Sequence, residues 1–224
     1  MLFRKNKNRF PKYYNEKEIA SIETFITERF GSYGNVFHEL VSPDIHLDVA
    51  IIDPTPERDH YTLVTMGAGA HIMNLPKGFP KDTLGRSELM IRLPPDWNIE
   101  SDEERWYWPI RWLKIVARVP IDQDTWIGWG HTIPTGEPVA ENTEFECMLL
   151  ANPENYDESA VRCQLPNGDF VNFYQILPIY EDEMEFKINV DATPLVDLLY
   201  EKDIHGVVDI RRKSVVEELM EHHE

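Results

Sequence analysis

The chain reads Arg86-Ser-Glu-Leu-Met-Ile-Arg-Leu-Pro-Pro-Asp-Trp97, then Trp106-Tyr-Trp-Pro-Ile-Arg-Trp-Leu113, then Thr125-Trp-Ile-Gly-Trp-Gly-His-Thr132, and these three stretches hold all six of its tryptophans. A tryptophan side chain buries a large apolar area and keeps one N–H group that needs a partner. Six of them in one short segment predict a densely packed, hydrogen-bonded unit at the centre of the fold.

The composition of the whole chain is that of a globular protein. Of its 224 residues, 42% are hydrophobic and 28% are charged, and a chain of this length can bury roughly 70% of its unfolded surface. No repeat and no linker divides it. We therefore expect a single domain over residues 1–224, with its core at about 20–190 and a polar C-terminal tail at about 203–224.

The charge is strongly acidic, with 40 Asp and Glu against 22 Lys and Arg and a formal net charge of −18. Such a surface repels a nucleic-acid backbone and favours a basic protein partner. The plainer alternative is that the charge only keeps the protein in solution.

The same sequence argues against a membrane or an oxidising compartment. No apolar run approaches the roughly 20 residues that cross a bilayer, and the N-terminus carries no secretory signal. The only cysteines are Cys147 and Cys163, which we expect as buried free thiols rather than as a cross-strand disulfide. A cytoplasmic protein that binds neither membrane nor nucleic acid is predicted.

Hydrophobic periodicity predicts helices mixed with strands, an α/β (α+β) class. Apolar residues at helical spacing predict a helix at 16–30, ended by Gly31. A capping box at Ser101, followed by Pro109, predicts a short helical turn and then a new, largely buried helix that begins at Pro109. Strands are predicted at 36–53, 60–66, 87–93, 144–150, 160–165 and 170–179, with an Asn167-Gly168 hairpin before the last strand and a final helix at 192–202.

Histidines and carboxylates offer one candidate site. Asp44, His46 and Asp48 alternate along one face of the predicted 36–53 strand, and His60 and His71 belong to the neighbouring segments. Such a group can hold a divalent metal. The alternative interpretation is the solvated face of a half-buried strand.

Two loops offer other chemistry. Gly67-Ala-Gly69-Ala resembles the beginning of a dinucleotide fingerprint, but Ile72 stands where the third glycine is needed and Pro76 prevents a long helix. These glycines are better explained by positive φ angles or close backbone approach at a strand end. His131 follows two tryptophans and has the chemistry of an acid–base catalyst, or of a histidine that only bonds to a backbone group.

Several uncommon sequence motifs occur in an order that resembles that of the suppressor of fused domain. They are Asp48-Val-Ala-Ile-Ile-Asp-Pro54, Tyr61-Thr-Leu-Val-Thr-Met-Gly67, Ser87-Glu-Leu-Met-Ile-Arg-Leu-Pro94, Trp97, Trp108-Pro109 and Gly130-His-Thr132. The resemblance covers about residues 20–190. It implies a mixed, largely antiparallel sheet flanked by helices, with no established catalytic residue and no cofactor.

The resemblance also carries expectations about partners. In animals, suppressor of fused is a two-domain scaffold that sequesters a transcription factor by clamping a peptide between its halves. This chain resembles the first half only, so the resemblance does not imply a clamp or a transcription-factor partner for it. Stand-alone bacterial domains of this kind resemble immunity proteins or antitoxins encoded beside toxins.

Three hypotheses follow. The first is an immunity protein that neutralises a basic toxin domain by stoichiometric occlusion, without metal or cofactor. The second is a metal-dependent or small-molecule enzyme that uses His46, Asp48, His71 and His131, and the third is a scaffold without a toxin partner, dimerising through an unpaired sheet edge. For the first, we expect partner contacts at Gly67, Gly69, His71, Trp126, Trp129, His131, Glu141, Glu144, Glu181, Asp182 and Glu183.

Overall fold

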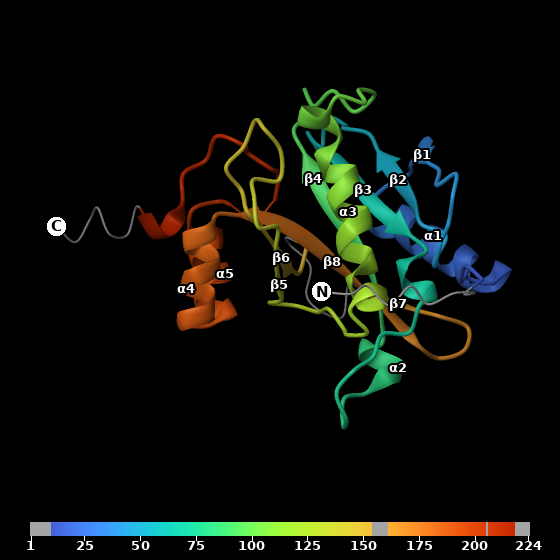
Figure 1. Cartoon of the computed structure of the whole chain (residues 1–224). Helices are drawn as coiled ribbons and strands as arrows, with labels where there is room; N and C mark the ends of the chain where they lie inside the picture. The colour runs from blue at the N-terminus through green and yellow to red at the C-terminus, as the bar shows by residue number, and fades with distance from the viewer. Residues whose placement is uncertain (1–9, 154–160, 205, 218–224) are drawn as a thin grey trace.

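The computed structural model describes residues 10–153, 161–204 and 206–217, and within them one eight-stranded sheet carries the fold (Figure 1). The strand order is β1-β2-β3-β4-β8-β6-β5, and β7 pairs with β8 beside this path. The strands are β1 Asn35–Phe37, β2 Asp48–Ile52, β3 Tyr61–Met66, β4 Arg86–Leu93, β5 Thr132–Pro134, β6 Cys147–Ala151, β7 Arg162–Gln164 and β8 Phe170–Ile179. The helices are α1 Glu16–Arg29, η1 Ala68–Ala70, α2 Lys81–Leu84, α3 Glu104–Asp122, α4 Glu181–Asn189 and α5 Ala192–Glu201.

The sheet is mixed and largely antiparallel, as predicted. β4 and β8 pair in parallel at its centre, and the other strand pairs of the described residues are antiparallel. Every residue of β4 is buried, because helices cover both faces of the central strands. Figure 1 shows α3 in front of β3 and β4, and α1 behind them.

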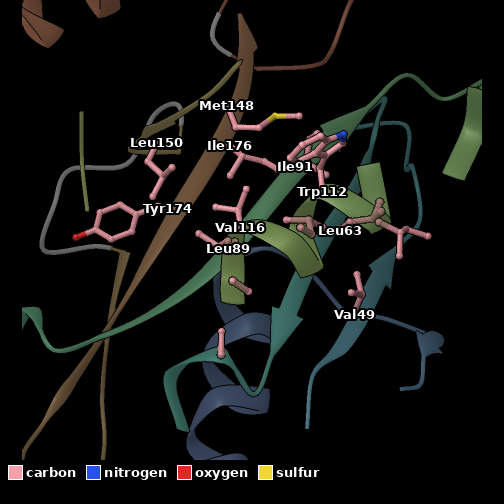
Figure 2. Packing of buried hydrophobic residues seen from close by; sticks show 14 of the residues in the cluster. Val49, Leu63, Leu89, Ile91, Trp112, Val116, Met148, Leu150, Tyr174 and Ile176 are labelled. Atoms are coloured by element: carbon pink, nitrogen blue, oxygen red, sulfur yellow. The ribbon is translucent and has the colours of Figure 1, made fainter. Parts of the chain in front are cut away.

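Alternate residues of the strands build two separate cores. Leu89 and Ile91 of β4 pack with Trp112 and Val116 of α3, and Figure 2 shows these side chains gathered between helix and sheet. Met90, between them in the sequence, packs on the other face with Ile22 and Ile26 of α1 and with Phe30, which follows the helix. A third cluster joins α5 to β6 and β8. Trp97, Trp108 and Trp112 are buried in the first core, as predicted, whereas Trp129 is 40% exposed, so the central packing unit does not include the whole tryptophan-rich segment.

The single predicted strand at 36–53 is wrong, because the chain folds back on itself within this range. β1 and β2 pair with each other, with Val36 opposite Ala50. Two carboxylates close the connecting loop: Glu39 accepts a hydrogen bond from the Leu47 N–H (3.1 Å), and Asp48 accepts one from the Glu39 N–H (2.9 Å). Alternation alone did not reveal this reversal.

The predicted break at Pro109 is also wrong, since α3 is one helix from Glu104 to Asp122. Proline has no N–H to donate to the carbonyl four residues earlier, that of Arg105. The side-chain amide of Asn142 donates to this carbonyl instead (3.2 Å). Ser101 lies outside the helix and accepts a hydrogen bond from the Glu103 N–H.

The C-terminal residues differ from the predicted polar tail. Within the described residues 206–217, the Val208 N–H donates to the Arg92 carbonyl of β4 (3.0 Å), and Val215 is buried. Arg212 pairs with Glu183 of α4, a helix absent from the prediction. The ion pair between Arg212 and Glu183 therefore fixes residues 206–217 against α4, although their polar composition predicted a frayed tail.

Other predicted elements agree with the structure, although the strand predicted at 144–150 begins at Cys147, and residue 160 of the strand predicted at 160–165 lies outside the described residues. The helices at 16–30 and 192–202 and the hairpin at Asn167-Gly168 are confirmed. Cys147 and Cys163 are free and buried, and burial raises the pKa of the Cys147 thiol to about 12 and that of the Cys163 thiol to about 11. In the part of the chain that the structure describes, no helix is long and apolar enough to cross a membrane.

Candidate functional site

The two loops that the sequence singled out lie against each other. The Asn74 N–H donates to the Thr125 carbonyl (3.1 Å), and the Asn74 side-chain amide donates to the carbonyl of Asp124 (3.2 Å). The Ile127 N–H points at the sulfur of Met73 (3.4 Å). Segments that are about 50 residues apart in sequence thus form one surface next to the edge strand β5.

Aromatic side chains cover this surface. The rings of Phe79 and Trp126 have centroids 5.4 Å apart, and Trp126 meets His131 edge to face at 4.4 Å. Trp129 is 40% exposed and Phe79 is 44% exposed. Phe79, Trp126 and His131 are joined by ring contacts, and Ile72 and Trp129 are exposed on the same two segments of the chain. We call these five residues the aromatic patch. Several exposed apolar side chains on neighbouring segments indicate an interaction site more often than a single exposed residue does.

A cavity of about 310 Å³ borders the aromatic patch, and Trp126, His131 and Lys187 of α4 line it. Burial and the Lys187 ammonium lower the pKa of His131, whose ring also bonds to the Trp126 backbone. The imidazole is therefore neutral at pH 7 and adds no charge to the patch. Ile188 and Val190, which follow Lys187, are both exposed.

Gly67 and Gly69 are buried and support the surface rather than belong to it. Gly67 has φ +127°, and a Cβ there would lie 1.9 Å from the His46 carbonyl oxygen. A Cβ on Gly69 would lie 2.1 Å from the Tyr14 hydroxyl. The predicted reason for these glycines, positive φ and close approach, is confirmed. Since both are covered, we drop them from the set of candidate contacts.

Glu88 organises the turn that contains these glycines, and no sequence pattern pointed to it. Its side chain is fully buried, and its carboxylate accepts five hydrogen bonds of 2.6–3.2 Å. The donors are the hydroxyls of Tyr14 and Thr65 and the backbone N–H groups of Gly67, Ala68 and Gly69. Burial raises the pKa of Glu88, and the hydrogen bonds act in the opposite direction.

The predicted acidic contacts separate into two groups. Glu141, Glu144 and Asp182 line one cavity of about 650 Å³, and Glu181 is exposed on the first turn of α4. Glu183 is fully buried, where its carboxylate pairs with Arg212 and accepts the Val215 N–H (2.9 Å). Glu183 is therefore a structural anchor and does not belong to an exposed acidic surface.

The residues of the alternative enzyme site have different partners. His46 lies 3.3 Å from Asp48, whereas the His71 ring lies 2.9 Å from the Lys12 ammonium and His131 packs on Trp126. Across residues 10–153, 161–204 and 206–217, no three His, Cys, Asp or Glu side chains are grouped to hold a metal ion. The geometry thus gives these side chains separate structural roles.

Comparison with known proteins identifies the family of this chain. The family model described as suppressor of fused protein (SUFU) matches residues 43–213. The chain is 24% identical over 206 residues to Uncharacterized protein UU111 of Ureaplasma parvum serovar 3, which covers 91% of this chain and 98% of that protein.

Solved structures share the fold. A SUFU homolog from Neisseria gonorrhoeae FA 1090 superimposes with a TM-score of 0.64 at 19% identity, covering 90% of this chain and 98% of that one. A chain of the Sufu-Fu complex gives a TM-score of 0.67 at 16% identity, covering 95% and 96%. Drosophila Suppressor of Fused gives 0.60 at 16% identity, where the match spans 94% of this chain and 53% of that protein.

Proposed function

This chain belongs to the suppressor of fused family, and we propose on that basis that it acts by binding another protein, as an immunity protein that occludes a basic toxin. A chain of this fold occurs in a complex of two proteins, Sufu and Fu. Binding without turnover also suits a site built from aromatic side chains, because it needs no activated nucleophile or proton donor.

The aromatic patch is the observation that carries the proposal. Trp129 exposes 40% of its surface although the other tryptophans of the chain are buried or half-buried. Exposed tryptophan is costly in a soluble monomer, and tryptophan is enriched among the side chains that dominate binding energy at interfaces. Phe79, 44% exposed, and Ile72, 47% exposed, offer further apolar surface.

The net charge supports a basic partner. With −18 formal charges, the protein attracts a basic protein at long range, and complementary potentials raise the association rate. A toxin that acts on nucleic acid has a basic working surface, since it must bind phosphates. Covering that surface one to one neutralises the toxin.

The test is a comparison of two variants with equally exposed apolar residues. Trp129→Glu places a charge in the aromatic patch, and Ile115→Glu does the same on α3, where Ile115 is 39% exposed. Each variant is used to capture proteins from the native cells, and captured proteins are identified by mass spectrometry. We expect a one-to-one basic partner with wild type and Ile115→Glu, and at least tenfold less of it with Trp129→Glu.

Expression of the captured partner alone decides between an immunity protein and a scaffold. Toxicity that co-expression of this chain relieves supports the immunity protein. A harmless partner supports the scaffold instead. Equal capture by both variants, or a pure protein that carries stoichiometric metal and no partner, would contradict the proposal.

A further inference from the structure

Two adjoining cavities lie on the C-terminal side of the sheet, away from the aromatic patch. The first, of about 370 Å³, lies where β8 and α5 meet segments 202–204 and 206–209. The second, of about 650 Å³, lies between residues 141–144, the first turn of α4 and residues 210–217. Arg212 and Lys213 line both cavities, so the two lie side by side and share a wall.

The smaller cavity has mostly apolar walls. Its lining includes Phe145, Leu177, Leu199, Ile204, Val207 and Val208. Val207 is 39% exposed at its mouth. An apolar wall with a rim of charged side chains binds an apolar side chain from solution, because removing both apolar surfaces from water is favourable.

The larger cavity has an excess of negative charge. Its lining contains four carboxylates, those of Glu141, Glu144, Asp182 and Glu217, and three cations, Arg211, Arg212 and Lys213. Asp182 accepts a hydrogen bond from the Ser214 hydroxyl, which leaves its charge in place.

Arg212 does not neutralise this excess, because its charge is already matched. Both of its terminal nitrogens lie 2.7 Å from the buried carboxylate of Glu183, and one of them also donates to the Pro178 carbonyl (3.0 Å). The guanidinium packs on the rings of Phe145 and Tyr180, at 4.9 and 4.8 Å from their centroids. Arg212 is thus a fixed wall between the cavities, and four carboxylates face two cations.

We propose that this double cavity binds an extended segment of the partner protein in which an apolar side chain stands beside a lysine or arginine. The apolar side chain enters the smaller cavity, and the cation lies among Glu141, Glu144 and Glu217. The inference rests on the proposed function, since it specifies the chemistry of the basic partner. It adds a second contact surface, separate from the aromatic patch.

The probe is a library of random 12-residue peptides displayed on phage and selected on the immobilised full-length protein. We expect selected peptides to share an apolar residue within two positions of lysine or arginine. Synthetic copies are then titrated against wild type and three variants, with thermal melting as the check on folding. Glu141→Gln/Glu144→Gln alters the larger cavity, Val207→Asp alters the smaller one, and Glu185→Gln/Asp197→Asn removes two charges from exposed side chains of α4 and α5 that line neither cavity.

We expect the dissociation constant to rise at least tenfold in each cavity variant and less than twofold in the Glu185→Gln/Asp197→Asn control. The salt dependence of binding should also become weaker in Glu141→Gln/Glu144→Gln, because fewer charges are paired. Equal losses in Glu141→Gln/Glu144→Gln and the control would show that net charge alone attracts the peptides. That result, or selected peptides without the apolar–basic pair, would overturn the inference.

The two proposals fail in different ways. If Trp129→Glu loses the cellular partner while both cavity variants keep it and bind peptides as wild type does, the proposed function stands and the double cavity is no binding site. If the cavity variants lose the peptides but no cellular partner depends on Trp129, the cavity stands and the proposed function fails.

Discussion

Glu88 lies fully buried in β4, and its carboxylate holds the 67–69 turn that supports the aromatic patch. Three of its hydrogen-bond partners are backbone N–H groups, which can only donate. We therefore expect Glu88→Gln to lower the free energy of unfolding by about 1–3 kcal/mol, because in either orientation its amide NH2 would face at least one of these N–H groups and leave it without an acceptor. Urea unfolding monitored by tryptophan fluorescence measures this change.

Two further variants make the Glu88 prediction specific. Tyr14→Phe removes one hydrogen bond to the carboxylate (2.8 Å) and should cost about 1.5–3 kcal/mol. Glu23→Gln, on the exposed side of α1, should change stability by less than about 0.5 kcal/mol. A Glu88→Gln protein as stable as Glu23→Gln would show that the carboxylate does not organise the turn.

The sequence predicts much of the surroundings of Glu88 and little of its role. Alternation in 87–93 correctly separates Leu89 and Ile91 from Met90, which face different cores. It also places Glu88 on the face of Met90. Tyr14 and the 67–69 turn surround the carboxylate through long-range contacts, and no local pattern contains this information.

Helix α3 continues through Pro109 because a neighbouring loop supplies the missing donor. The Asn142 side-chain amide bonds to the Arg105 carbonyl, which the proline leaves without its helical partner. We predict that Asn142→Ala lowers stability by about 0.5–1 kcal/mol in the wild-type chain. In a Pro109→Ala background, where the new N–H reaches Arg105, the same change should cost much less.

A double-mutant cycle over Asn142 and Pro109 tests this coupling, with each free energy taken from chemical unfolding. We expect a coupling energy of about 0.5 kcal/mol or more. Strictly additive losses would mean that the carbonyl of Arg105 does not depend on Asn142.

Whole elements were predicted well where their periodicity is long and less well where it is short. The apolar spacing within α1, α3 and α5 and the alternation of β8 identify these elements at once. α4 was missed, since Glu181, Asp182 and Glu183 together have the composition of a solvated surface and Tyr180 is an unusual residue at a helix N-cap. The loop that separates β1 from β2 was also missed. It is held by hydrogen bonds from side chains to the backbone, and such bonds leave no periodic pattern of apolar residues in the sequence.

For the molecule as a whole, the family and the mixed sheet could be predicted from the sequence. The packing of residues 206–217 against β4 and α4 could not. The sequence motifs that resemble the family lie in the strands and the tryptophan-rich segment. Residues 43–213, which the family model matches, include all of them. Residues 206–217 are polar, and local composition cannot reveal a partner about 30 residues away. Arg212 reaches Glu183 through a tertiary contact between residues 206–217 and α4.

This pairing leads to a prediction about the whole fold. Glu183 is fully buried, and Arg212 is the cation that pairs with it among the described residues. Arg212→Met therefore leaves a buried carboxylate without its matching charge. Stability should fall by about 3–5 kcal/mol, whereas Arg211→Met, at the exposed neighbouring position, should change it by less than about 0.5 kcal/mol. Calorimetry or urea unfolding measures both.

The double variant Arg212→Met/Glu183→Leu separates a missing charge partner from lost packing. If the cost of Arg212→Met comes from the uncompensated carboxylate, removing that carboxylate should restore most of the lost stability, because a buried ion pair and an apolar pair of similar volume have comparable free energies. If it comes from the contacts of Arg212 with Phe145 and Tyr180, the double variant should be no more stable than Arg212→Met. The first outcome would identify the ion pair as the link that joins the C-terminal segment to the sheet and shapes the wall between the two cavities.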